Sequence, residues 1–279
     1  MVKKAVVLAR GLGTRMQKER EGVELDDESD RIARQGLKTL IPVRGRPFLD
    51  FIIASLLTAG LRDICLVVAP DCETLKDYAE QVSSASDATV TWAVQEEALG
   101  TADAVLAAES FAGDDSFVLC NSDNLYPREA LSMLAKATER GCCVAAFNRD
   151  SLVTQGNIAR DRVRDMAVVV ADDNGNLVKI IEKPPEPEEY ARDGQVWVNM
   201  NLYRFSPDIF DACRTIDFDP RRGELELTSA VQLLCERGNV PFRVAFSDEG
   251  VLDMTSREDV PAVREALQDR QPGFPATSW

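Results

Sequence analysis

Short apolar runs recur along the first half of the chain, and helix-like segments separate the early ones. The runs lie at positions 4–9, 64–69, 89–94, 116–120 and 143–147. Strands that alternate with helices build βαβ units, in which helices cover both faces of a mostly parallel sheet. The pattern therefore predicts an α/β fold with three layers.

Helix-like segments in this half carry residues that start or stop a helix. Pro47 opens an apolar stripe over 48–57, and Gly60 is suited to end it. A second helix is predicted to begin near Thr101, and a third to run over 127–140. These helices are expected to pack on the sheet.

The second half is richer in strand patterns. Segments 166–171 and 177–182 flank the turn Asp172-Asp173-Asn174-Gly175, which predicts a β-hairpin. A further strand is expected over 196–205. We interpret this half as a lobe built onto the first half.

Two stretches interrupt these patterns. Residues 19–30 carry seven acidic side chains against one arginine, so a solvated loop or short helix is expected there, with a lid as the alternative role. The prolines of segment 184–189 prevent a regular element after the hairpin.

Bulk composition is typical of a soluble enzyme. The 279 residues are 45% hydrophobic, which is enough for a large core. A net charge of −15 argues against nonspecific binding to nucleic acid or to an anionic membrane. The longest nearly apolar stretch, 51–61, is too short to span a bilayer. We expect a cytoplasmic protein with small-molecule partners, and the sequence leaves a homo-oligomer open.

The chain contains no histidine, which narrows its chemistry. Ser-His-Asp and Cys-His nucleophile systems, histidine-ligated zinc and imidazole acid–base catalysis are excluded. Carboxylate, lysine and arginine chemistry remains. Phosphoryl and nucleotidyl transfer suit that inventory, because they depend on positioning and on charge neutralisation by Mg²⁺, Lys and Arg.

The first apolar run ends in a glycine-rich turn, Arg10-Gly11-Leu12-Gly13-Thr14-Arg15-Met16. Such a turn exposes backbone N–H groups at the carboxyl end of a buried strand, where α/β folds bind phosphorylated ligands. The turn fits neither the Walker A nor the Rossmann fingerprint. Taken alone, it is also compatible with an ordinary strand-to-helix turn.

Further short segments follow this turn in a fixed order. They are Leu37-Lys38-Thr39-Leu40-Ile41-Pro42-Val43, Gln95 with Leu99-Gly100-Thr101-Ala102-Asp103-Ala104, Ser122-Asp123-Asn124-Leu125-Tyr126, Glu182-Lys183-Pro184, Asn199-Met200-Asn201-Leu202-Tyr203, Gly223-Glu224-Leu225-Glu226-Leu227-Thr228 and Leu252-Asp253-Met254-Thr255. The ordered set, over about residues 4 to 260, resembles the sugar-1-phosphate nucleotidylyltransferases, also called NDP-sugar pyrophosphorylases. Within that family the set resembles the glucose-1-phosphate thymidylyltransferase and UTP-glucose-1-phosphate uridylyltransferase type.

The resemblance implies a three-layer, Rossmann-like and GT-A-like nucleotidyltransferase fold, with a sugar-binding lobe added to the mixed, mostly parallel sheet. It implies one domain over 1–279. Residues 1–150 would form the nucleotide-binding half, residues 151–260 the sugar-phosphate-binding lobe, and residues 261–279 a C-terminal helix and tail.

It also implies roles for charged residues at the matching positions. Arg15 would contact the β- and γ-phosphates of the nucleotide, Lys38 the charge that develops at the α-phosphate, and Lys183 the sugar phosphate. Asp123 and Asp253 would jointly hold Mg²⁺, a hard cation that prefers carboxylate oxygens and water.

Two further sets of residues would bind the substrates, NTP and sugar 1-phosphate. The nucleotide-binding set comprises Leu8, Ala9, Gly11, Gly13, Thr14, Gln95, Gly100 and Thr101. The sugar-phosphate set comprises Gly156, Glu182, Lys183 and Asn199. A glutamine amide both donates and accepts, so Gln95 is expected to pair with uracil or thymine, which favours UTP or dTTP.

The sequence departs from the family's pattern at several positions, among them Arg10, Asn201 and the segment Met254-Thr255-Ser256 that follows the second aspartate. Arg10 stands where a small residue is common, and it would either strengthen triphosphate binding or pair with the acidic segment. Asn201 stands at a glycine position, which puts the identity of the sugar in doubt. Two alternatives stay open: a cytidylyltransferase that acts on a non-sugar phosphate such as phosphocholine, and a noncatalytic nucleotide- or sugar-sensing homologue.

Overall fold

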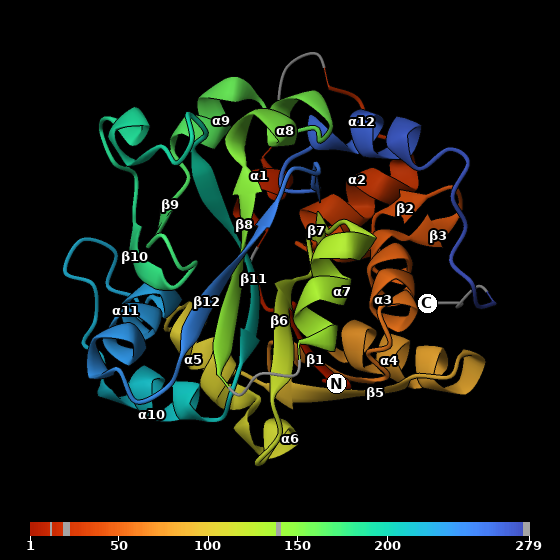
Figure 1. Ribbon diagram of the computed structural model, residues 1–279. Helices are drawn as coiled ribbons and strands as arrows, with labels where there is room; N and C mark the ends of the chain where they lie inside the picture. Colours follow the sequence, from red (N-terminus) through yellow and green to blue (C-terminus); the bar gives the residue numbers. More distant parts are fainter. Residues whose placement is uncertain (12, 19–22, 138–140, 276–279) are drawn as a thin grey trace.

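A central mixed sheet with helices on both faces organises the molecule (Figure 1). The computed structural model describes residues 1–11, 13–18, 23–137 and 141–275. In chain order the elements are β1 (Lys4–Leu8), α1 (Thr14–Gln17), α2 (Asp27–Arg34), η1 (Lys38–Leu40), β2 (Pro42–Val43), β3 (Arg46–Pro47), α3 (Phe48–Thr58), β4 (Asp63–Val68), α4 (Glu73–Ala85), β5 (Thr89–Val94), α5 (Thr101–Ala107), α6 (Glu109–Ala112), β6 (Phe117–Asn121), β7 (Asn124–Leu125), α7 (Arg128–Lys136), β8 (Cys142–Asn148), α8 (Arg149–Thr154), α9 (Arg160–Arg164), β9 (Val168–Ala171), β10 (Leu177–Ile181), η2 (Pro187–Tyr190), β11 (Trp197–Phe205), α10 (Asp208–Thr215), α11 (Leu227–Arg237), β12 (Phe242–Ser247), β13 (Leu252–Asp253) and α12 (Asp259–Ala266).

The large sheet joins strands from both halves of the chain. Its order is β10-β9-β11-β6-β1-β4-β5, with β8 paired to β11 and β12 paired to β8. The pairs β1–β4, β1–β6 and β4–β5 are parallel, whereas β11 runs antiparallel to β6, β8 and β9. The predicted α/β fold with a mixed sheet is confirmed.

Central strands of the large sheet supply side chains to two separate cores, because successive residues of a strand point to opposite faces. In β1, Ala5 and Val7 belong to one buried cluster together with residues of α3, α4 and α7. Val6 belongs to the other cluster, together with residues of α5, α10 and α11. Two helical layers therefore sandwich the sheet, as Figure 1 shows.

The predicted third helix is shorter than expected. Helix α7 ends at Lys136, and the next residue, Ala137, has an extended ψ of 124°. The guanidinium of Arg204, on β11, donates from Nη1 to the Ala137 carbonyl (2.9 Å) and from Nη2 to the Gly141 carbonyl (3.2 Å). Such tertiary hydrogen bonds compete with continued helix at this point. Residues 138–140 lie outside the described residues.

The acidic segment contains a helix that packs on the core. Asp26 caps α2 by accepting from the Ser29 backbone N–H (2.9 Å), and Ile32 and Ala33 of α2 are fully buried. Arg257 contacts Asp30 (2.5 Å) from the C-terminal part of the chain. The short-helix prediction for 19–30 is confirmed at 27–30, where α2 begins, and residues 19–22 lie outside the described residues.

The predicted hairpin is present as β9 and β10, which pair antiparallel across the turn at 172–175. In the part of the chain that the structure covers, none of the helices is both long and apolar enough to traverse a bilayer. The strand expected over 196–205 forms β11 and reaches the middle of the sheet. This strand brings residues of the second half to the ends of β1 and β6.

Candidate active site

Two neighbouring cavities lie beyond the carboxyl ends of β1 and β6. The first, of about 510 Å³, is lined by residues of the glycine-rich turn and of the segment after β5. The second, of about 370 Å³, is lined by residues of β11, of the segment after β10 and of β13. Asn121, Asp123 and Asn201 line both cavities, so Asp123 stands on a shared wall.

The glycine-rich turn forms one side of the first cavity. Gly13 has φ +60°, and a Cβ there would lie 2.8 Å from the Gly36 carbonyl oxygen, so this position needs glycine. Gly11 and Thr14 line the cavity, as does Leu8 of β1. Ala9 instead donates its N–H to the Val67 carbonyl (2.9 Å). Leu12 lies outside the described residues.

The opposite side of this cavity is the segment that follows β5. Gln95 is 5% exposed, and its side-chain amide donates to the Gly100 carbonyl (3.0 Å) and to Asp103 Oδ2 (2.8 Å). Both N–H bonds of that amide are therefore used within the protein. The side-chain oxygen Oε1 is the part of the Gln95 amide that remains to meet a ligand.

Arg10 links the glycine-rich turn to the segment after β5 through hydrogen bonds. Its Nε donates to the Gln95 carbonyl (2.7 Å), and its Nη2 donates to the Glu96 carbonyl (3.2 Å). The guanidinium also lines the first cavity. The departure at Arg10 thus joins the two sides of the cavity through backbone carbonyls.

The loop before α11, far away in the sequence, is hydrogen-bonded to the start of α5. Leu225 donates its N–H to the Leu99 carbonyl (2.6 Å) and accepts from Ala102 N–H (2.9 Å), and Thr101 Oγ1 accepts from Leu227 N–H (2.9 Å). Gly100 lies between these contacts with φ +123°, and a Cβ there would come within 2.5 Å of the Leu225 carbonyl oxygen. Gly100 and Thr101 both line the cavity.

Two carboxylates meet at the shared wall because a small ladder joins their segments. Strands β7 and β13 pair Asn124 with Asp253, and Met254 N–H donates to the Asp123 carbonyl (2.8 Å). The Thr255 hydroxyl lies 3.3 Å from Asp123 Oδ2 and 3.1 Å from Asp253 Oδ2. The predicted pair Asp123 and Asp253 is therefore brought together.

Asp253 is buried and accepts from several donors. Its Oδ1 accepts from Arg162 Nη2 (2.7 Å) and Thr255 N–H (3.0 Å), and its Oδ2 accepts from Asn124 Nδ2 (2.9 Å). Burial, followed by the nearby charge of Asp123, raises the pKa of Asp253. A cation beside the two carboxylates would offset both effects.

This donor set fits a hard divalent cation. The described residues contain no group of three or more His, Cys, Asp or Glu side chains that could hold a metal. Mg²⁺, however, usually takes only one or two protein carboxylates and completes its shell with water and substrate phosphates. Asp123 and Asp253, with the Thr255 hydroxyl between them, suit that requirement.

Cations flank the carboxylates on both sides. Lys38 forms an ion pair with Asp123 and lines the first cavity. Arg15 and Lys183 line the second cavity. Arg15 was expected to contact the β- and γ-phosphates of a nucleotide, yet it borders the second cavity and is absent from the lining of the first.

The asparagines of β11 form the floor of the second cavity. Asn199 Nδ2 donates to Asn201 Oδ1 (3.2 Å), and Asn201 N–H donates to Asn199 Oδ1 (2.9 Å). Asn201 has φ +55°, a left-handed conformation that asparagine tolerates better than other non-glycine residues. That tolerance explains how asparagine can occupy a position where the family pattern has glycine.

Comparison with models of protein families matches residues 4–269 to the family described as nucleotidyl transferase. The chain belongs to the nucleotidyl transferase family. The resemblance found in the sequence is thereby confirmed.

Two curated relatives of this nucleotidyl transferase cover most of the chain. The low-salt glycan biosynthesis nucleotidyltransferase Agl11 of Haloferax volcanii is 29% identical over 237 residues, which cover 84% of this chain and 58% of the relative. A glucose-1-phosphate thymidylyltransferase of Streptomyces antibioticus is 30% identical over 284 aligned positions, gaps included, and the alignment covers 98% of this chain and 69% of the relative. The chain thus spans 58% of the length of the first relative.

The fold is shared with solved structures. The structure of a UDP-glucose pyrophosphorylase complexed with UDP-glucose has a TM-score of 0.71 to this nucleotidyl transferase, at 19% identity, and covers 97% of this chain and 100% of the other. The likeness supports the predicted three-layer nucleotidyltransferase fold.

Two residues predicted to bind the sugar line neither cavity of this nucleotidyl transferase. A Cβ on Gly156 would lie 2.5 Å from the Val251 carbonyl oxygen, so Gly156 packs against the segment that leads into β13. The next residue, Asn157, accepts from Asp253 N–H (2.7 Å) and donates to the Asp253 carbonyl (2.8 Å). Gly156 therefore lies where it supports the position of Asp253.

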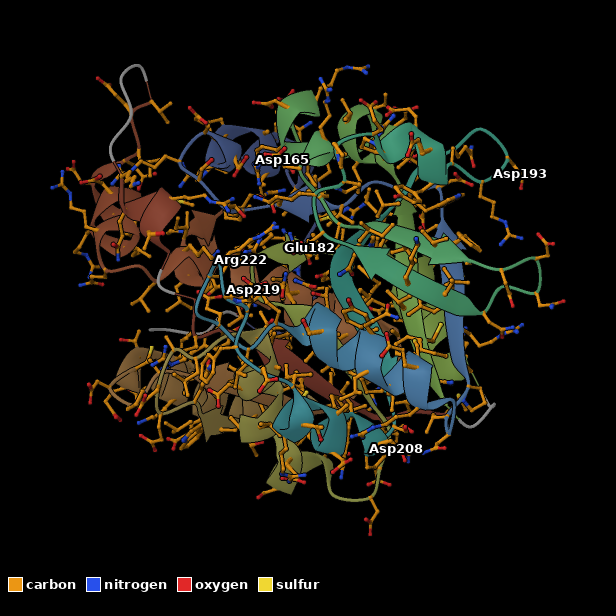
Figure 2. The ribbon with its side chains drawn as sticks, turned by 90° about the vertical axis from the view of Figure 1, so that its left-hand side faces the viewer. Asp165, Glu182, Asp193, Asp208, Asp219 and Arg222 are labelled. Carbon is orange, nitrogen blue, oxygen red and sulfur yellow. The ribbon has the colours of Figure 1, made fainter. Side chains whose placement is uncertain are left out.

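Glu182 also lies outside both linings. Figure 2 shows its side chain beside Arg222, which belongs to the loop before α11, and the charge of Glu182 contributes to raising the Arg222 pKa. The largest cause of that rise is the hydrogen bond from Arg222 to Glu226 (2.8 Å). Glu182 thus lies close to the loop before α11.

Sequence reasoning missed several residues that line the second cavity. They are Arg162, Asp165, Met166 and Thr255. Thr255 belongs to a segment that the resemblance had singled out. The other three lie in or after α9, a five-residue helix whose sequence has no periodicity that distinguishes it from an exposed basic segment.

Proposed function

We propose that this enzyme transfers a nucleotidyl group from a nucleoside triphosphate to a sugar 1-phosphate, giving an NDP-sugar and pyrophosphate. The observation that carries the proposal is the position of Asp123 on the wall shared by the two cavities. Two substrates bound in the two cavities would meet at this carboxylate. The relative from Streptomyces antibioticus, which is named for such a reaction, supports the same assignment.

The nucleotide is assigned to the first cavity. The backbone at Gly11 and Thr14 offers the exposed glycine-rich turn that phosphates require, and Lys38 supplies a cation. The base is assigned to the opposite wall, at Gln95 and Gly100, where glycine lets the backbone approach a flat ring.

The base is proposed to be uracil or thymine. Because the side-chain N–H groups of Gln95 are used by Gly100 and Asp103, Gln95 would accept from N3–H of the base. The Gly100 backbone N–H is the donor that we assign to the base O4. The nucleotide would then be UTP or dTTP.

The sugar 1-phosphate is assigned to the second cavity. Lys183 and Arg15 would neutralise its phosphate, and the paired amides of Asn199 and Asn201 would meet the sugar hydroxyls. These groups suit a hexose-like sugar.

The reaction would proceed by in-line displacement. An acceptor phosphate oxygen attacks the α-phosphorus, the bond from that phosphorus to the bridging oxygen breaks, and pyrophosphate leaves with the electron pair. Lys38 would neutralise charge that develops on the α-phosphate and leaving group. Asp123 and Asp253 would hold Mg²⁺, which when bound supplies charge neutralisation to the phosphates.

Pyrophosphate release is the direct test. Purified enzyme would be incubated with Mg²⁺, with each of dTTP, UTP and CTP, and with glucose 1-phosphate, other hexose 1-phosphates or phosphocholine. We expect release with dTTP or UTP and one hexose 1-phosphate. If every pair is inactive while calorimetry detects NTP binding, the noncatalytic alternative replaces the proposal.

A cytidylyltransferase is the second candidate, because one observation favours it. With its N–H groups occupied, Gln95 presents only an acceptor, and the N4 amino group of cytosine is also a donor. Preference for CTP with phosphocholine in the same assay would establish this candidate.

A further inference from the structure

Arg162 contributes a guanidinium to the second cavity that neither the sequence nor the family resemblance assigns. It belongs to α9, and it lines the cavity together with Arg15 and Lys183. Its side chain is 27% exposed, whereas Arg160 and Arg164 of the same helix are exposed residues. The cavity wall therefore contains a third cation.

Two carboxylates hold this guanidinium from two sides. Nη1 donates to Asp259 Oδ1 (2.8 Å), and Nη2 donates to Asp253 Oδ1 (2.7 Å). Asp259 is itself fixed, because its Oδ2 accepts from the Ser256 N–H (2.7 Å) and hydroxyl (2.9 Å). A guanidinium clamped in this way loses little further conformational entropy when it binds an anion.

The two ion pairs leave N–H groups of Arg162 available to a ligand. A guanidinium has five N–H bonds, and the two hydrogen bonds to Asp253 and Asp259 use one each on Nη1 and Nη2. A planar fork of N–H groups matches a phosphate, which it can bind through two oxygens.

The ion pair with Arg162 uses Oδ1 of Asp253 and not Oδ2, whose neighbours are the Asn124 amide and the Thr255 hydroxyl. Arg162 contacts Oδ1 of Asp253, whereas Oδ2 is the oxygen that shares the Thr255 hydroxyl with Asp123. A cation between the two aspartates would approach from the Oδ2 side. Arg162 and the cation can therefore occupy opposite sides of the same carboxylate.

We propose that Arg162 is a phosphate-binding residue of the acceptor site, where it contacts the phosphate monoester of the second substrate alongside Lys183. This inference rests on the proposed function for the identity of the acceptor. It adds a residue whose guanidinium faces the acceptor from α9.

The test compares Arg162→Met with Arg160→Met, an exposed arginine of the same helix that lines neither cavity. Titration calorimetry with glucose 1-phosphate in Mg²⁺ would measure acceptor affinity. Loss of a charge-assisted contact predicts that Arg162→Met weakens this affinity by about tenfold or more, while Arg160→Met leaves it within about twofold. Equal affinity of the Arg162→Met and wild-type proteins would overturn the inference.

Mn²⁺ binding, measured by electron paramagnetic resonance without substrate, separates this role from support of Asp253. We expect the Mn²⁺ affinity of Arg162→Met to stay within about threefold of wild type. A Mn²⁺ loss as large as the acceptor loss would show that Arg162 acts through Asp253, and would refute the assignment.

A second variant covers the case in which Arg162→Met folds poorly. Arg162→Lys keeps the charge but has only three N–H donors on one nitrogen, so with both carboxylates paired it can offer a phosphate a single hydrogen bond in place of a planar fork. Its acceptor affinity should therefore fall between those of Arg162→Met and wild type. Acceptor affinity equal to that of wild type would count against the inference. The proposed function fails separately, if glucose 1-phosphate or inorganic phosphate binds through Arg162 but no pair of substrates releases pyrophosphate.

Discussion

At the residue scale, two positions with an unusual backbone conformation lie beside the second cavity. Four non-glycine residues with positive φ occur among the described residues, and two of them, Lys183 (φ +42°) and Asn201 (φ +55°), line this cavity. Such conformations cost free energy and persist only where the surrounding structure enforces them. Strain at these two positions is consistent with a site that fixes the directions of its side chains.

Substitution of Asn201 tests that conformational requirement. Asn201→Gly should change the free energy of unfolding by less than about 1 kcal/mol, because glycine adopts positive φ freely. The free energy of unfolding of Asn201→Val should be about 1–2 kcal/mol lower than that of Asn201→Gly, because a β-branched residue disfavours positive φ. Urea unfolding followed by circular dichroism measures both, and equal stabilities would contradict the strain argument.

Asp123 is the residue on which the proposed chemistry depends most. Asp123→Asn removes the charge that pairs with Lys38 and would hold the cation, so turnover should fall by about 100-fold or more. The melting temperature should remain close to that of wild type. Asp115→Asn is the control, because Asp115 is 70% exposed and pairs with Lys4. Near-normal turnover of Asp123→Asn would remove Asp123 from the metal site.

At the scale of elements, α2 begins in the acidic segment and packs its buried face on the core. Arg257 reaches it from the segment before α12: it donates from Nε to the Met16 carbonyl (2.9 Å) and from Nη1 to Asp30. Arg264 contacts Asp26 (2.8 Å) at the start of the same helix. Helices α1 and α2 are thus tied to the C-terminal part of the chain, which argues against a free lid at 26–30, the part of the acidic segment 19–30 that these contacts hold.

The N-cap of α2 can be tested directly. Asp26→Ala should lower the free energy of unfolding by about 1 kcal/mol, because the Ser29 N–H loses its acceptor. Asp26→Asn keeps a capping oxygen and should lose less. Chemical denaturation at neutral pH measures the difference, and an unchanged Asp26→Ala protein would show that the cap contributes nothing.

The same residue predicts a pH dependence of stability. Burial acts to raise the pKa of Asp26, but hydrogen bonds from Ser29 and Arg264 outweigh it and lower that pKa from 3.8 to about 2. The folded pKa is depressed, so the stabilisation is present above the unfolded value and is lost as the pH falls from about 4 to about 2. Asp26→Asn should lose less stability than wild type over this interval in acid titrations of unfolding.

At the scale of the whole molecule, contacts between distant segments build the first cavity. The Leu227 N–H and the Thr101 hydroxyl join across 126 residues of sequence, and Gly100 lies against Leu225 beside them. The loop before α11 therefore shapes the wall that we assign to the base. The close backbone approach at Gly100 makes this junction sensitive to a single added carbon.

Gly100→Ala should disrupt that junction. The new Cβ would meet backbone atoms of Leu225 at 2.5–3.0 Å, and overpacking of this kind costs about 1–3 kcal/mol. The KM for NTP should rise as well. Gly113→Ala is the matched control, because Gly113 also has positive φ (+56°) but open space around a Cβ. If both variants have the same KM for NTP, the junction does not shape the nucleotide site.

Local patterns in the sequence were sufficient to predict the fold class, the hairpin and the glycine-rich turn. Apolar periodicity, turn residues such as those at 172–175 and the order of the short segments are properties of neighbouring residues, so they can be recognised without coordinates. The residues Asp123 and Asp253 were identified in this way, and the structure brings them together. The predicted end of the third helix was wrong, because the helix stops at Lys136 and Arg204 from β11 donates to the Ala137 carbonyl that follows it.

Other features depended on packing between distant segments. The sequence alone selected Asp123, Asp253, Lys38 and the glycine-rich turn. Three features are visible only in the tertiary structure. Arg162 pairs with Asp253, Gly156 packs against the segment that leads into β13, and the side-chain amide of Gln95 donates to groups of the protein itself. The reason is physical: residue type and spacing limit which chemistry a chain can perform, but the partners of a side chain are decided by which segments the sheet and its loops bring within hydrogen-bond distance.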